Sequence, residues 1–91
     1  MYLHLGQDVV VRMEQVVGIF DLENSTVSKI TRQYLAEATK QGRVVNVSME
    51  MPKSFVVCTG KDKETTVYIS QISAATLRKR TNFLSDLPFV L

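Results

Sequence analysis

The chain has 91 residues, of which 45% are hydrophobic and 22% charged, with a formal net charge of +2. This composition excludes disordered, collagen-like and coiled-coil proteins and leaves room for one small globular domain. The apolar runs are far shorter than the roughly 20 residues of a membrane span. No basic leader precedes an apolar stretch, and the single cysteine, Cys58, cannot form an internal disulfide. We therefore expect a cytoplasmic protein.

The first quarter of the sequence predicts strands. Residues 2–5 alternate, residues 9–13 are rich in β-branched side chains, and Gly6-Gln7-Asp8 between them is typical of a turn. Residues 16–22 predict another strand, in which Gly18 marks a bulge or a close approach of the backbone.

A long helix is predicted from about Thr26 to Gln41. Residues 24–26 are of the types that favour an N-cap, and Gly42 is a typical residue just beyond a helix end. Apolar side chains recur at helical spacing from Val27 to Ala38, and lysine and arginine lie on the opposite face. We thus expect a helix with one apolar and one basic stripe.

The next segments predict a strand, a loop and a hairpin. Residues 43–48 have a strand pattern, whereas Pro52 makes residues 49–53 a loop and not a central strand. Residues 54–59 and 65–70 predict a hairpin with a polar connection.

A short helix is predicted after the hairpin. Ile72 precedes a Ser73 cap, and Leu77 follows at the spacing of a hydrophobic staple. Arg78-Lys79-Arg80 would end this helix, where cations suit the negative end of the helix dipole.

These elements predict an α+β fold: a mostly antiparallel sheet of about five strands with one long helix and one short C-terminal helix. Residues 1–82 would form the domain, and residues 83–91 an apolar tail that packs on its own domain or docks on a neighbouring subunit. Self-association is a common remedy for the marginal stability of so small a domain. The predicted core is Leu3, Leu5, Val17, Ile19, Val27, Ile30, Tyr34, Val45, Val57, Val67, Ile69 and Leu77.

The residue types that carry catalysis are scarce. His4 and Cys58 have no partners at a recognisable spacing, so they are interpreted as structural. A phosphate-binding loop needs a glycine, four further residues and then Gly-Lys-Ser/Thr at the start of a helix. Thr59-Gly60-Lys61-Asp62 does not have this pattern. The acidic residues show no paired spacing either. We expect no enzyme, no cofactor, no metal site and no small-molecule ligand.

Two groups of cations remain. Lys29, Arg32 and Lys40 share one helix face, and Arg78-Lys79-Arg80 form a second cluster. Each group fits either contacts with DNA phosphates or a solvated surface, and helix capping is a further interpretation of the second. An oligomer would repeat either patch, and avidity can make weak patches functional.

Four motifs occur in a specific order and spacing: residues 2–6, 18–23, 52–57 and 67–77. Together they resemble the small bacterial extracellular-matrix regulatory proteins of Rem type (RemA/RemB), and particularly the B branch. The resemblance covers residues 1 to about 80. Its specificity comes from the joint order of the motifs, since none of them has a catalytic meaning.

The resemblance implies a cytoplasmic transcription regulator of biofilm-matrix genes, a ring-shaped homo-oligomer that contacts double-stranded DNA. The A branch carries arginines at two places where this chain has Gln15 and Met51-Pro52-Lys53, so Lys53 alone keeps a positive charge in that loop. The alternative is a protein–protein adaptor of the same fold without direct DNA binding. The candidate DNA-contacting residues, with Lys53 favoured, are Lys53, Arg12, Lys29, Arg32, Arg78, Lys79 and Arg80.

Overall fold

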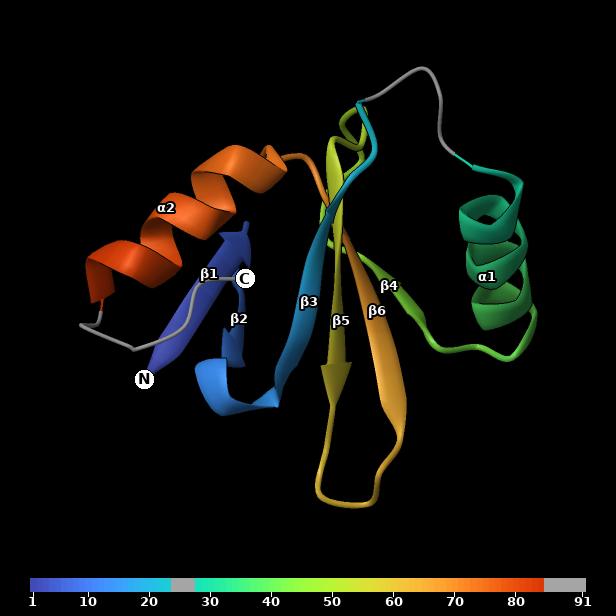
Figure 1. Ribbon diagram of the computed structural model, residues 1–91, viewed down its shortest axis with the longest axis horizontal. Coiled ribbons are helices and arrows are strands. Elements are labelled where there is room, and N and C mark those ends of the chain that lie inside the picture. The colour runs from blue at the N-terminus through green and yellow to red at the C-terminus, as the bar shows by residue number, and fades with distance from the viewer. Residues whose placement is uncertain (24–27, 85–91) are drawn as a thin grey trace.

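A computed structural model, which describes residues 1–23 and 28–84, has a four-stranded sheet with a helix on one side and a hairpin and second helix on the other (Figure 1). The sheet runs β3 (Val16–Asp21), β5 (Ser54–Thr59), β6 (Thr65–Ser70) and β4 (Val44–Asn46). The hairpin pairs β1 (Tyr2–Gly6) with β2 (Val9–Arg12). The helices are α1 (Lys29–Lys40) and α2 (Ala74–Leu84), and a 3₁₀ turn covers Met13–Gln15.

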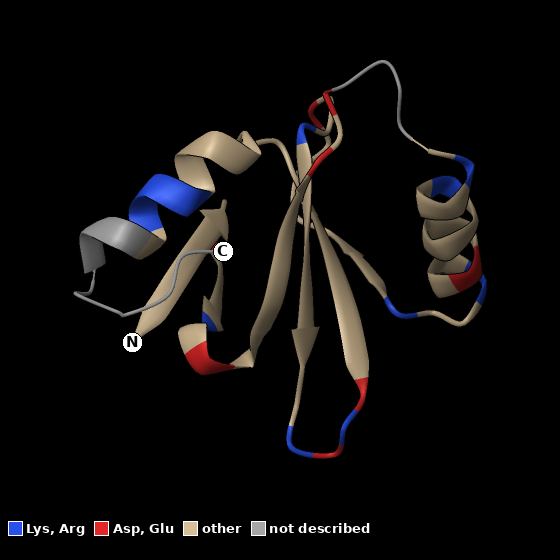
Figure 2. Cartoon of the chain, viewed as in Figure 1, with Lys and Arg blue, Asp and Glu red and all other residues tan. Residues whose placement is uncertain are grey.

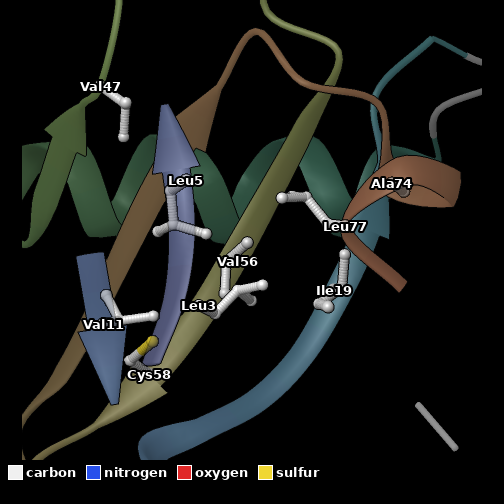
Figure 3. Close-up of a cluster of buried hydrophobic side chains, with 9 residues drawn as sticks. All are labelled: Leu3, Leu5, Val11, Ile19, Val47, Val56, Cys58, Ala74 and Leu77. Atoms are coloured by element: carbon white, nitrogen blue, oxygen red, sulfur yellow. The ribbon is translucent and has the colours of Figure 1, made fainter. Parts of the chain in front are cut away.

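Strand β5 is buried on both faces, because its successive side chains enter two different cores. Val56 and Cys58 point to the side of the hairpin and α2, where they meet Leu3 and Leu77 (Figure 3). The buried residues of this core are Leu3, Leu5, Val11, Ile19, Val47, Val56, Cys58, Ala74 and Leu77. The smaller core on the α1 side contains Ala38, Phe55, Val57 and Val67.

Buried serine hydroxyls join the hairpin and the segment before α2 to the sheet. The Ser70 hydroxyl donates to the Leu5 carbonyl over 2.7 Å and accepts from the Ile72 N–H over 3.0 Å. The Ser54 hydroxyl donates to the Ile72 carbonyl over 2.7 Å. Both serines are fully buried. The serines of motifs 52–57 and 67–77 thus satisfy backbone groups where three segments meet.

The α+β class, the turn at residues 6–8 and the hairpin of residues 54–59 and 65–70 are confirmed, and the sheet arrangement is corrected. The described residues form six strands in two sheets, whereas the sequence predicted about five strands in one sheet. Most pairs are antiparallel, but β4 and β6 pair in parallel. The β1–β2 hairpin packs across the larger sheet and does not extend it. The predicted bulge is present in β3, where the register shifts between Val16 and Gly18.

The helix lengths are also corrected, because α1 has 12 residues and α2 has 11, so neither is long or short relative to the other. Helix α1 begins at Lys29, and its N-cap is Ser28, whose hydroxyl accepts from the Thr31 N–H. The predicted cap at residues 24–26 lies outside the described residues. Ser73 is confirmed as a capping residue of α2, since its hydroxyl accepts from the Thr76 N–H.

Helix α2 continues past Arg80 to Leu84, so Arg78-Lys79-Arg80 lie in its middle. The interpretation of these cations as C-terminal capping residues is therefore wrong. The backbone of residues 83–84 belongs to the helix, and the other residues of the predicted tail lie outside the described part of the chain. Neither described helix is long and apolar enough to cross a membrane.

Half of the predicted core is confirmed: Leu3, Leu5, Ile19, Val57, Val67 and Leu77 are buried. Ile69 is half-buried against the smaller core, and Val27 is not described. The prediction is wrong for Val17, Ile30, Tyr34 and Val45, which are all exposed, Ile30 by 78%.

The four errors have two causes. Helix α1 is rotated from the predicted phase, so that Thr31, Leu35 and Ala38 face the sheet, while Ile30 and Tyr34 lie beside an open groove that Val17 also lines. Val45 lies on the short edge strand β4. Both sets of helical positions satisfy the same spacing rule, so the sequence pattern does not choose between them.

Candidate nucleic-acid interface

Two of the candidate cations on α2 hold the fold together. The Arg78 guanidinium donates to the Ile19 carbonyl of the edge strand β3 over 3.0 Å, and Arg78 is half-buried. The Arg80 guanidinium donates to the His4 carbonyl of β1 over 2.8 Å. Each arginine thus satisfies a backbone carbonyl of a strand packed under the helix. Lys79 between them is exposed.

Replacing Arg78 by alanine is expected to lower the free energy of unfolding by about 1–3 kcal/mol, because the Ile19 carbonyl loses a charged donor in a partly buried place. Lys79→Ala is the matched control on the same turn and is expected to stay within about 0.5 kcal/mol of the parent. Urea denaturation followed by circular dichroism measures both. Equal stability of the two variants would contradict the structural role of Arg78.

Arg12 and Lys53 both have acidic neighbours. Arg12 forms a 2.9 Å ion pair with Glu14. A backbone hydrogen bond and this guanidinium together hold the pKa of Glu14 below its ordinary value. The Lys53 carbonyl accepts from the Leu22 N–H over 2.9 Å, which places Lys53 beside the end of β3 that carries Asp21 and Glu23. These carboxylates weaken the positive potential that a phosphate would meet.

Lys29 and Arg32 lie in the first turn of α1, and both are exposed. Among the described residues, Arg12 and Glu14 form the ion pair, and no described carboxylate pairs with Lys29 or Arg32. The N-terminal end of a helix adds a partial positive charge to this place. This pair thus offers an anion two exposed cations with no described carboxylate paired to either.

The candidate cations do not share one surface. Figure 2 shows basic residues on α1 and on α2 with the sheet between the two helices, and mixed charges in the turns at both ends of the sheet. The structure brings Lys29 and Arg32 together and brings Arg78, Lys79 and Arg80 together, but it separates these two groups. Arg12 and Lys53 lie apart from both, at the ends of β2 and of the loop before β5.

The other chemistry-bearing residues have structural surroundings. The His4 ring is 2.7 Å from the Gln7 carbonyl, to which its Nε2–H donates. Burial raises the pKa of the Cys58 thiol to about 11, so this thiol is protonated at neutral pH and is a poor nucleophile. Within residues 1–23 and 28–84, no three His, Cys, Asp or Glu side chains gather as a metal site would require.

Sequence reasoning missed an apolar groove between α1 and strands β3 and β5. Its lining includes Val17, Ile30 and Tyr34, which the sequence assigned to the core. The hydrophobic pattern was a true signal of apolar surroundings. The pattern did not tell whether the atoms that surround these side chains belong to the same chain.

Comparison with known proteins finds similarity over nearly the whole chain. The profile of the RemA-like family, described as extracellular matrix regulatory protein A-like, matches residues 2–81. The chain belongs to the RemA-like family. It is also 36% identical over 87 residues to extracellular matrix regulatory protein B of Bacillus subtilis (strain 168). The aligned residues make up 96% of this chain and 98% of that protein. The predicted resemblance to Rem-type proteins, and to their B branch, is confirmed.

Membership of the RemA-like family gives the four sequence motifs a common setting. Residues 2–6 form β1, residues 18–23 begin in β3, residues 52–57 lead into β5, and residues 67–77 run from β6 into α2. All four lie around the larger core and its buried serines. The RemA-like motifs of this chain therefore contribute to its scaffold.

Proposed function

We propose that the chain is a non-enzymatic transcription regulator of extracellular-matrix genes that contacts DNA phosphates as a ring-shaped homo-oligomer in the cytoplasm. Kinship over nearly the full length with matrix regulatory proteins supports the regulatory part. The observation that carries the DNA part is the exposed pair Lys29 and Arg32 at the N-terminal end of α1, which has no described acidic partner.

Two cations per copy suffice for DNA binding when an oligomer repeats them, and a ring is such an oligomer. A single copy offers two cations in one place, whereas a closed ring repeats the pair in every subunit around one rim. A duplex that follows the rim meets the copies one after another, and the contacts act together through their high effective concentration. Contacts of this kind are independent of DNA sequence and sensitive to salt.

The structural surroundings change the order of the candidate residues. Lys29 and Arg32 come first, with exposed Lys79 as a second contact. Lys53 keeps a place because its loop precedes β5, but we expect a smaller effect there because Asp21 and Glu23 lie nearby. Substitution of Arg78 or Arg80 is expected to act first on stability.

The test combines mass in solution with binding of duplex DNA as salt rises from 50 to 200 mM. We expect an oligomer whose affinity falls steeply with salt, by about a thousandfold or more if it makes six or more phosphate contacts. Lys29→Glu with Arg32→Glu is expected to weaken binding to all sequences alike and to lower the salt slope by about two per engaged subunit. Lys61→Glu with Lys63→Glu, in the mixed-charge β5–β6 turn, is the control with the same change in net charge.

The second candidate is a protein–protein adaptor of the same fold without direct DNA binding. The engagement of Arg78 and Arg80 in backbone hydrogen bonds favours it, because these arginines are then less available to phosphates. An oligomer that ignores DNA even at 50 mM salt would select the adaptor and overturn the DNA-binding proposal.

A further inference from the structure

An apolar groove lies on the α1 side of the four-stranded sheet. Helix α1 packs on β4 and β6, and the groove lies between the helix and the part of this face that β3 and β5 form. The groove has a volume of about 330 Å³. It is lined by Val17, Phe20, Phe55 and Val57 from the sheet and by Ile30 and Tyr34 from the helix.

The floor of the groove is aromatic. The rings of Phe20 and Phe55 stack with their centroids 4.9 Å apart and their planes 18° apart. Phe20 reaches this position because residue 18 is glycine: a Cβ there would come within 2.7 Å of the Phe20 ring. The Cβ of any other residue would push the ring aside, so Gly18 preserves the shape of the floor.

The groove suits apolar side chains. Val17 and Ile30 at its edge are 56% and 78% exposed, and none of the described lining residues is charged. The hydroxyl of Thr31, which also lines it, already accepts from the Ser28 hydroxyl. Its volume is at the low end of ligand pockets, about 300–1,000 Å³. A short apolar segment fits this space better than a folded domain does.

Such a segment follows α2 in the same sequence. Residues 85–91 read Ser-Asp-Leu-Pro-Phe-Val-Leu, so five consecutive apolar residues come after one acidic residue. Proline is compatible with an extended peptide because its φ is fixed near −65°. The segment is as apolar as the groove, and an aqueous environment is unfavourable for both.

The segment follows a helix that lies on the other side of the sheet from the groove of its own chain (Figure 1). Helix α2 packs on the opposite face of the sheet, with Leu77 and Ala74 in the larger core. Its C-terminal end and α1 lie at opposite ends of the long axis in Figure 1, along which the molecule extends 35 Å. Leu87 is the third residue after Leu84 and stays within about 11 Å of it even in a fully extended chain.

We propose that residues 87–91 of one copy occupy the groove of a neighbouring copy, and that this contact assembles the homo-oligomer. The inference rests on the oligomer part of the proposed function and is independent of DNA binding. The two surfaces differ, so the contact is heterologous, and contacts of this class close into rings when the rotation between copies allows.

The test uses full-length variants whose mass is measured by light scattering. Ile30→Glu places a charge in the groove at an exposed position, and Phe89→Glu places one in the segment. Each is expected to weaken assembly by more than about tenfold, since burial of one large apolar side chain accounts for at least that factor. The matched controls are Ala36→Glu, exposed on the far side of α1, and Ser85→Glu; both are expected to assemble as the parent does.

Mixing the two variants is the decisive step. The Ile30→Glu copy keeps an intact segment, and the Phe89→Glu copy keeps an intact groove. A heterologous contact then allows one junction between them, so the mixture is expected to form a 1:1 heterodimer at a concentration at which each variant alone is a monomer. No isologous interface through α1 predicts this pattern.

Three other outcomes would overturn the proposal. If Ile30→Glu is monomeric and Phe89→Glu assembles as the parent does, the groove binds a different surface. If both variants assemble, the ring uses another interface and the oligomer part of the proposed function survives. If the parent chain is itself a monomer, the oligomer part also fails, and the salt titration decides the DNA part separately.

Discussion

Replacing Leu77 by alanine is expected to lower the free energy of unfolding by about 2–5 kcal/mol, the range for removing a large aliphatic side chain from a core. Leu77 has no exposed surface and packs with Leu3, Ile19 and Val56, where α2, the hairpin and the sheet meet. The cavity would remove contacts to α2, the hairpin and the sheet at the same time. A domain of this size has about 5–15 kcal/mol to lose, so the variant is expected to unfold at a much lower urea concentration.

Leu77→Met is the control, because it keeps the volume and the apolar character of the site and is expected to cost less than about 1.5 kcal/mol. Chemical denaturation monitored by circular dichroism compares the variants at one temperature. If Leu77→Ala unfolds at the same urea concentration as the parent, α2 does not contribute to the cooperative core.

Replacing Ser70 by alanine is the second large effect we expect, a loss of about 1–3 kcal/mol in the free energy of unfolding. The substitution removes the donor to the Leu5 carbonyl and the acceptor of the Ile72 N–H. Both backbone groups remain where water has little access, because Ser70 is fully buried. Leaving such groups unpaired costs more than the net value of the hydrogen bonds themselves.

The matched control is Ser48→Ala, at a loop serine whose hydroxyl accepts a single bond from the Glu50 N–H. It is expected to cost less than about 0.5 kcal/mol. Hydrogen exchange adds a local measurement: in Ser70→Ala, the amides of β1 are expected to lose protection before those of β5. Uniform loss in all strands would show that Ser70 supports the whole sheet and not the hairpin junction in particular.

Local signals predicted the elements that depend on neighbouring residues. The turn at residues 6–8, the Ser73 cap and the polar connection between β5 and β6 act over a few positions, and each is confirmed. The rotation of α1 depends on which part of the sheet it covers, so the helical pattern left two phases open. The length of α2 was misjudged because the arginine cluster imitates a helix end.

The candidate site was harder to predict than the fold. Arg78 and Arg80 donate to carbonyls 59 and 76 residues away in the sequence, and no local pattern distinguishes such an arginine from one that binds phosphate. Lys53 is no longer the favoured DNA contact, because the hydrogen bond between Leu22 and the Lys53 carbonyl brings the acidic end of β3 beside it. The exposure of Lys29 and Arg32 was predictable, since both lie opposite the apolar stripe in either phase of α1.

The β1–β2 hairpin is covered by parts of the chain that are far from it in the sequence, and this has a consequence for synthesis on the ribosome. Residues 2–12 are synthesised well before α2, against which Leu3 and Leu5 pack, and before Ser70, whose hydroxyl donates to the Leu5 carbonyl. An isolated two-stranded hairpin is at best marginally stable. At about 5–20 residues per second, the nascent chain carries this apolar hairpin uncovered for several seconds. We expect the newborn protein to depend on chaperones that shield its N-terminal residues until α2 has left the exit tunnel.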